Sequence, residues 1–229
     1  KAFIKTNPAF TGHTEYLSRK ADVKESLMVM NDDSLRVSMV TQHIPLEDVS
    51  KTLNADLIYD KIKLFHQSLS SDFGCQRPKI AVLALNPHGG ENGKIGTEEI
   101  EKIIPAIQRA EKDKIIVQGP FSADGFFGNA KFNHFDGVLA MYHDQGLIPL
   151  KLLDFDTGVN VTLGLPYPRT SPDHGTAYDV AGKNEADYES FKEAVFSAIQ
   201  IYKKLKEYKK ISKNPLKTSQ KKSFSKKKR

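Results

Sequence analysis

Short apolar runs alternate with segments of helical periodicity over most of the chain. The apolar runs, which are typical of buried strands, lie at residues 27–30, 35–40, 79–85, 114–117, 137–141 and 159–163. Apolar residues at helical spacing mark residues 53–69, residues 97–110 and a third segment that starts at Tyr188. Strands that alternate with helices predict an α/β protein with a largely parallel sheet.

The third helical segment places its apolar side chains on one face. They are Phe191, Val195, Ala198, Ile199, Tyr202 and Leu205, at the spacing of an amphipathic helix. Asp187 precedes the segment and is suited to cap its first turn. At the start of residues 97–110, the negative charges of Glu98 and Glu99 favour a helix N-terminus.

Charge is unevenly distributed along the chain. The net charge is +6 at pH 7, but residues 203–229 hold 13 basic residues and one acidic residue, so the remainder is acidic. Residues 212–229 therefore form a basic tail. This tail has almost no aromatic residues to stack on bases, which favours a solvated tail over attachment to nucleic acid.

Composition places the protein among soluble globular chains, with 39% hydrophobic and 27% charged residues. No apolar run reaches the roughly 20 residues that span a bilayer, so no membrane partner is expected. Cys75 is the only cysteine, which rules out an internal disulfide and suits a reducing compartment. The N-terminus has no signal-peptide pattern. We therefore expect a cytoplasmic protein.

Three of the predicted strands end in a histidine. The motifs TQHIP, NPHGG and YHDQG place His43, His88 and His143 just after apolar runs. Each one alone is more commonly a capping or half-exposed side chain. Parallel sheets, however, bind ligands at the carboxyl ends of their strands, and imidazole is a frequent ligand of zinc and similar ions. HExxH and CxxC motifs are absent, so a metal site requires these side chains to converge through the fold.

Two further polar clusters are candidates for ligand binding. Residues 86–99, NPHGGENGKIGTEE, are rich in glycine and asparagine ahead of a helix, which suits a phosphate or dinucleotide site. They contain no GxGxxG fingerprint, and a flexible loop is the alternative. Residues 158–182 combine Arg169 with several other polar side chains between prolines. Arginine offers a planar fork for phosphate or carboxylate.

Four segments together resemble the 4-hydroxythreonine-4-phosphate dehydrogenase family of vitamin B6 biosynthesis. They are FTGHTEYL, LNPHGGENGKIGTEEI, VLAMYHDQGLIPLK and GVNVTLGLPYPRTSPDHGTA, and they follow the order and spacing of that family. The resemblance implies the two-domain α/β/α architecture of the isocitrate and isopropylmalate dehydrogenases. It also implies a homodimer with its active site at the subunit interface.

The resemblance assigns roles to individual residues. It implies that His43, His88 and His143 bind a divalent metal (Zn, Mg or Co), with His143 reaching across from the other subunit. It implies that a small phosphorylated substrate is bound by His13, Thr14, Lys151, Asn160 and Arg169. Asp124, in SADGFF, matches an acidic residue near the reacting centre and is the candidate catalytic residue. NAD or NADP is the implied cofactor, but the resemblance does not assign the residues that contact it.

The same resemblance implies that the N-terminal part of the first domain is absent from this chain. Residues 1–183 are then mostly the metal- and substrate-binding α/β/α domain. Residues 184–211 form a helix that packs on the absent part, and residues 212–229 are the basic tail.

The activity implied is oxidation of 4-phosphooxy-L-threonine by NAD(P) with a divalent metal, followed by decarboxylation to 3-amino-2-oxopropyl phosphate for pyridoxal 5'-phosphate biosynthesis. One alternative keeps this chemistry on a four-carbon sugar-acid phosphate, erythronate or threonate 4-phosphate. Another is a metal-dependent hydrolase that uses the three histidines and a bound water. It is disfavoured because Asp124 and Asp144 are the only evident general bases nearby.

Overall fold

A mixed seven-stranded sheet forms the centre of the protein. The computed structural model describes residues 13–23, 25–32, 34–153, 158–173, 178 and 180–214. The strands are β1 (Leu27–Asn31), β2 (Arg36–Met39), β3 (Lys79–Leu83), β4 (Ile116–Phe121), β5 (Gly137–Ala140), β6 (Val159–Leu163) and β7 (Arg169–Pro172). Their order across the sheet is β4-β3-β5-β2-β1-β6-β7.

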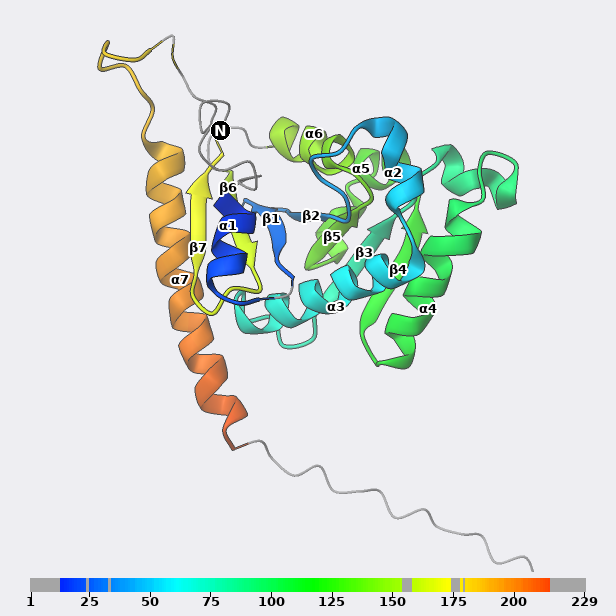
Figure 1. Ribbon diagram of the computed structural model, residues 1–229, viewed down its shortest axis with the longest axis horizontal. Helices are drawn as coiled ribbons and strands as arrows, with labels where there is room; N and C mark the ends of the chain where they lie inside the picture. Colours follow the sequence, from blue (N-terminus) through cyan, green and yellow to red (C-terminus); the bar gives the residue numbers. More distant parts are fainter. Residues whose placement is uncertain are drawn as a thin grey trace, which may run out of the picture.

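Helices lie on both faces of this sheet (Figure 1). They are α1 (His13–Lys20), α2 (Leu46–Thr52), α3 (Ala55–Ser71), α4 (Ile104–Lys112), α5 (Ala123–Gly128), α6 (His143–Leu153) and α7 (Glu189–Ser212). Short helical turns add η1 (Pro87–Gly93), η2 (Glu99–Ile103) and η3 (Lys131–His134). None of the described helices is long and apolar enough to cross a bilayer.

Alternate residues of the strands belong to two separate apolar clusters, one on each face of the sheet. Helices cover both clusters, so the protein has a three-layer α/β/α arrangement. In β1, Leu27 and Val29 face a cluster built with α3, α4 and α7. Met28 and Met30 point to the opposite face, where they join a cluster built with α5 and α6. This is the two-residue period of a strand that is buried on both faces.

Each of the six predicted apolar runs overlaps a strand, although β4 begins two residues later than predicted and extends to Phe121. The prediction of a largely parallel sheet is only half right. Strands β4, β3, β5 and β2 are parallel, whereas β1 runs antiparallel to both its neighbours and β7 runs antiparallel to β6. The short β1–β2 connection explains this, because a tight turn joins only antiparallel strands. The turn is fixed by Asp32, which accepts hydrogen bonds from the amides of Ser34 and Leu35.

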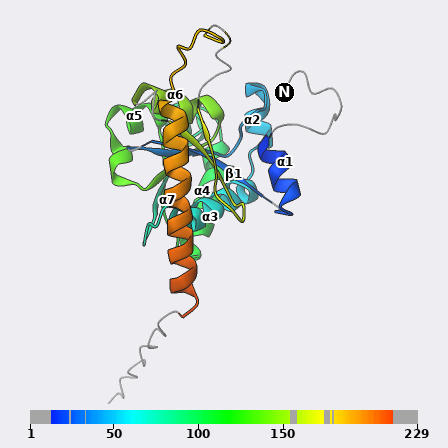
Figure 2. The same cartoon turned by 90° about the vertical axis from the view of Figure 1, so that its left-hand side faces the viewer.

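Helix α7 runs along β7 at the edge of the sheet (Figure 2). The Asp187 carboxylate accepts a hydrogen bond from the Glu189 amide at its start, as the sequence suggested. Its buried apolar side chains are Ala194 and Ile201. The side chains of the predicted apolar stripe face outward for the most part: Phe191, Val195, Ile199 and Tyr202 are all exposed.

Candidate functional site

The three histidines follow three adjacent parallel strands. β5 lies between β3 and β2 and pairs in parallel with both. His88, His143 and His43 come after the carboxyl ends of β3, β5 and β2, respectively. The topological equivalence expected from the sequence is therefore confirmed.

Two of these histidines share one cavity. The ring centroids of His43 and His143 are 5.9 Å apart, and both side chains line a cavity of about 220 Å³. The other lining residues are Thr14, Met28, Met30, Gln42, Leu147, Asn160, Arg169 and Asp173. The cavity lies beside α6, over the part of the sheet formed by β1, β6 and β7.

The floor of the cavity contains an amide with spare hydrogen-bonding capacity. Asn160 on β6 is paired with Met30 on β1, and its Nδ2 contacts the Met28 sulfur at 3.2 Å. The Asn160 Oδ1 is buried and accepts no hydrogen bond from the described residues. A buried amide oxygen without a donor is costly, so a donor on a bound ligand would stabilise this site.

A half-buried guanidinium stands next to this amide. Arg169 Nη1 donates a hydrogen bond to Thr162 Oγ1 at 3.0 Å, and burial lowers the pKa of Arg169. Within the described part of the chain no carboxylate lies within ion-pair distance of Arg169. Lys151, at the end of α6, pairs with Asp173 at 3.1 Å. The cavity therefore presents positive charge that suits an anion such as phosphate.

Local hydrogen bonds set the start of α6 and the orientation of its first residue. His143 Nδ1 is 2.7 Å from Asp144 Oδ1, and a proton on Nδ1 would leave Nε2 as the lone pair for a metal ion. The Gln145 side chain accepts a hydrogen bond from the Met141 amide and donates one to the Ala84 carbonyl. Gln145 thereby ties the ends of β5 and β3 together.

His88 is not among the residues that line this cavity, but its charge acts on Asp124. The Asp124 carboxylate accepts hydrogen bonds from Ser122 Oγ at 2.8 Å and from the Gly125 amide at 2.7 Å. These bonds, first the one from Ser122, lower the pKa of Asp124, and the charge of His88 adds to the effect. In the described residues no three His, Cys, Asp or Glu side chains are placed to hold one metal ion.

The structure thus brings together most, but not all, of the residues singled out in the sequence. Thr14, His43, His143, Asn160 and Arg169 line the cavity. Lys151 does not line the cavity but forms an ion pair with Asp173, which does. The side chain of His13 lies outside the part of the chain that the structure describes. We expected His143 to reach across from the other subunit, and this stays a prediction. Within one chain the His143 ring lies 5.9 Å from that of His43, whereas His88 does not line the cavity.

Sequence reasoning missed Asp173 and Gln42, which line the cavity, and Thr162, which accepts a hydrogen bond from Arg169. Asp173 had been noted only as one member of a polar cluster, and Thr162 not at all. Thr162 could have been found from strand alternation, because Asn160 and Thr162 are two residues apart on β6 and therefore share a face. For Gln42 the sequence carried no signal beyond its position next to His43.

These features define a three-layer α/β protein with a cavity lined by imidazole and guanidinium groups on one face of its sheet. The chain belongs to the family described as pyridoxal phosphate biosynthetic protein PdxA, whose family model matches residues 1–198. It is 49% identical over 209 residues to 4-hydroxythreonine-4-phosphate dehydrogenase of Bacteroides thetaiotaomicron, covering 91% of this chain and 57% of that protein.

Solved structures agree with this assignment. The crystal structure of 4-hydroxythreonine-4-phosphate dehydrogenase from Klebsiella pneumoniae matches with a TM-score of 0.76 and 41% identity, covering 84% of this chain and 59% of that one. The enzyme of the same name from Burkholderia phymatum matches with a TM-score of 0.74 and 43% identity, covering 83% and 58%. The chain therefore spans less than two thirds of the length of these relatives.

Proposed function

We propose that this chain is the metal- and substrate-binding part of an NAD(P)-dependent 4-hydroxythreonine-4-phosphate dehydrogenase that oxidises and decarboxylates 4-phosphooxy-L-threonine. The observation that carries the proposal is the Arg169 guanidinium, half-buried beside Asn160 and next to the His43–His143 pair. This arrangement places an anion-binding group within one cavity of two imidazoles. The relatives that bear this enzyme name supply the substrate class.

Residues in and near the cavity have defined tasks in this proposal. Arg169 and Lys151 hold the phosphate group by charge-assisted hydrogen bonds, and the Asn160 Oδ1 accepts a hydrogen bond from a hydroxyl or ammonium group of the substrate. Asp124 is the candidate catalytic residue; hydrogen bonds from Ser122 and the Gly125 amide lower its pKa, which keeps it ionised at neutral pH but makes it a weaker base. A divalent ion (Zn, Mg or Co), when bound, would polarise the oxygen of the substrate during hydride transfer and decarboxylation.

The two imidazoles of one cavity fit a divalent ion only in part, because catalytic zinc sites usually have three protein ligands. We propose that His88 of a second copy completes the set, with Asp124 of that copy beside it. This keeps the expected homodimer but changes which ligand crosses the interface.

Mixing inactive subunits tests this arrangement. A mixture of His43→Ala and His88→Ala chains should regain bound zinc, because one of the two sites in a mixed dimer would hold all three histidines. A mixture of His43→Ala and His143→Ala chains should stay empty. Recovery of zinc only in the second mixture would restore His143 as the ligand that crosses the interface.

The substrate is tested separately. Nicotinamide absorbance would be followed with 4-phosphooxy-L-threonine and with erythronate 4-phosphate, each with NAD and with NADP. Faster turnover of the threonine derivative is expected. Faster turnover of erythronate 4-phosphate would assign the chain to the alternative sugar-acid phosphate dehydrogenase.

We also propose that the outward face of α7 packs on the portion of its relatives that this chain does not match. Phe191, Ile199 and Tyr202 form an exposed apolar stripe there, and a stripe of this kind usually contacts another surface. Such packing fits the two-domain architecture of the isocitrate and isopropylmalate dehydrogenases. A cytoplasmic location is proposed separately, because a single cysteine suits a reducing compartment.

A further inference from the structure

The turn that carries His88 has an unusual backbone. Five consecutive residues from His88 to Asn92 lie in the left-handed region, with φ values of 53, 64, 76, 42 and 56°. Three of them, His88, Glu91 and Asn92, are not glycine. Left-handed conformations are sterically disfavoured for such residues, and a run of them persists only where neighbouring groups enforce it.

The carboxylate of Glu99 lies against this turn. This side chain is only 2% exposed. Its Oε1 accepts hydrogen bonds from the amides of Leu85 and Asn86, each at 2.8 Å, and its Oε2 accepts one from Asn86 Nδ2 at 3.0 Å. No cation is paired with Glu99 in the described part of the chain, so these three N–H groups alone compensate its burial.

The turn wraps tightly around this carboxylate. A Cβ atom on Gly90 would lie 2.6 Å from Glu99 Oε2, and one on Gly96 would lie 2.5 Å from Asn86 Nδ2. The amide of Ile95 donates to the Gly90 carbonyl at 3.0 Å and closes the loop. Two glycines are therefore required because the backbone approaches Glu99 and Asn86 directly.

Glu98 connects the same unit to the segment that carries His43. Its Oε2 accepts a hydrogen bond from Asn86 Nδ2 at 2.7 Å, and its Oε1 accepts one from Ser50 Oγ. Ser50 lies on α2, the helix that follows His43. The Asn86 side chain is thus held between two adjacent carboxylates, one of which is anchored to α2.

We propose that Glu99 is a positioning residue that fixes the left-handed turn and thereby the direction of the His88 imidazole. The proposal rests on the proposed function in one respect, the role of His88 as a metal ligand. It adds that the geometry of this ligand is set by a buried carboxylate that does not touch the metal.

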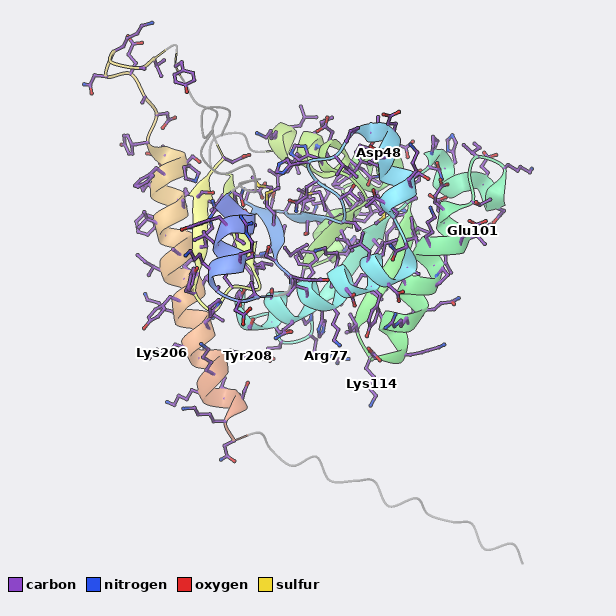
Figure 3. The ribbon with its side chains drawn as sticks, in the orientation of Figure 1. Asp48, Arg77, Glu101, Lys114, Lys206 and Tyr208 are labelled. Carbon is purple, nitrogen blue, oxygen red and sulfur yellow. The ribbon has the colours of Figure 1, made fainter. Side chains whose placement is uncertain are left out.

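The test compares Glu99→Gln with Glu101→Gln. Glutamine keeps the shape of Glu99 but replaces one acceptor with an NH₂ group that faces the Asn86 carboxamide. Glu101, labelled in Figure 3, is an exposed glutamate in the same helical turn and provides the matched control. Zinc affinity, measured by competition with a chromophoric chelator, should fall about 10- to 100-fold in Glu99→Gln, the range for groups that support a ligand, and stay unchanged in Glu101→Gln.

Hydrogen–deuterium exchange supplies a readout that does not depend on metal. Amides of residues 87–96 should exchange faster in Glu99→Gln, while those of residues 104–112 keep their protection. A second pair of variants, Gly90→Ala and Gly89→Ala, perturbs the contact between the turn and Glu99 from the side of the turn. Both glycines have a positive φ, so alanine is strained at either position, but only a Cβ at position 90 would meet the Glu99 carboxylate. Gly90→Ala should weaken zinc binding more than Gly89→Ala.

The outcomes separate the positioning role from the metal. A folded Glu99→Gln variant with unchanged zinc affinity, or with unchanged exchange in residues 87–96, would overturn the proposal. Equal effects of Gly90→Ala and Gly89→Ala would do the same. If the unaltered chain binds no zinc, the metal part of the proposed function fails, and the exchange comparison alone decides whether Glu99 holds the turn.

Discussion

Replacement of Gly146 by alanine should loosen α6 from the sheet and shift His143. Gly146 lies in the first turns of α6, where an added Cβ would sit 2.5 Å from Val37 Cγ1 and 3.3 Å from Ala140 Cβ. Carbon atoms normally approach to about 3.5–4.0 Å, so roughly 1 Å of movement is needed. Val37 is fully buried and has little room to move. Overpacking of this kind costs about 1–3 kcal/mol, which corresponds to a Tm lower by about 2–12 °C for a chain of this size.

The displacement should also reach the metal ligand, because His143 begins the same helix. Ligand distances tolerate errors of only about 0.2 Å, so zinc affinity should fall together with Tm. Gly128→Ala is the control, since nothing lies within 4 Å of a Cβ at that helical position. Thermal melting and zinc titration of both variants are the assays. Equal Tm values for the two variants would refute the packing argument, and a lower Tm with unchanged zinc affinity would refute the link between α6 and His143.

Three further predictions concern the anion site, a carboxylate and α7. Arg169→Lys should weaken phosphate-ester binding by about 1.5–3 kcal/mol because the planar fork is lost; unchanged affinity with a lower ligand-free Tm would make Arg169 structural. The pKa of Glu98 is lowered from 4.5 to about 2, chiefly by the Ser50 hydrogen bond. The ionised Glu98 carboxyl, with its hydrogen bonds from Ser50 and Asn86, therefore contributes stability above pH 4.5 that is lost as the pH falls toward 2; about 3 kcal/mol is the upper bound, and solvent screening at this largely exposed group reduces it to a fraction of that. Glu98→Gln should flatten the fall in Tm across that window, and an unchanged pH profile would contradict the assignment. Ile201→Ala should cost about 2–4 kcal/mol in denaturant unfolding, whereas Ile199→Ala on the outward face should cost at most about 0.5 kcal/mol; equal costs would show that the outward face is packed.

The sequence predicted those parts of the fold that depend on local apolar runs. Strand β6 was predicted with its observed bounds, and the histidines were expected at strand ends because polar residues followed apolar runs abruptly. Strand β7 was missed because it is an edge strand of polar residues, half-buried between α7 and the cavity. Helix α6 was missed because Pro149 interrupts its pattern and its first turn consists of the polar residues after β5.

The arrangement of the site could not be predicted from the sequence, because it depends on the order of the strands in the sheet. His43 and His143 are close because β2 and β5 are neighbours, although 100 residues separate them in the chain. Nothing local to either motif encodes that adjacency. The left-handed turn that carries His88 was missed for another reason, because non-glycine residues rarely adopt positive φ and the motif gives no sign of it.

The turn at Asp32 has a consequence for how the cavity forms. It sets the register in which Met30 pairs with Val37, and a slip of one residue would exchange the two faces of β1. Leu27 and Val29 would then replace the methionines beneath the anion site. A hairpin of this size forms in microseconds, whereas β6 joins the sheet only after more than a hundred further residues of chain. We therefore expect the floor of the cavity to be decided at the beginning of folding, by one aspartate that never contacts a ligand.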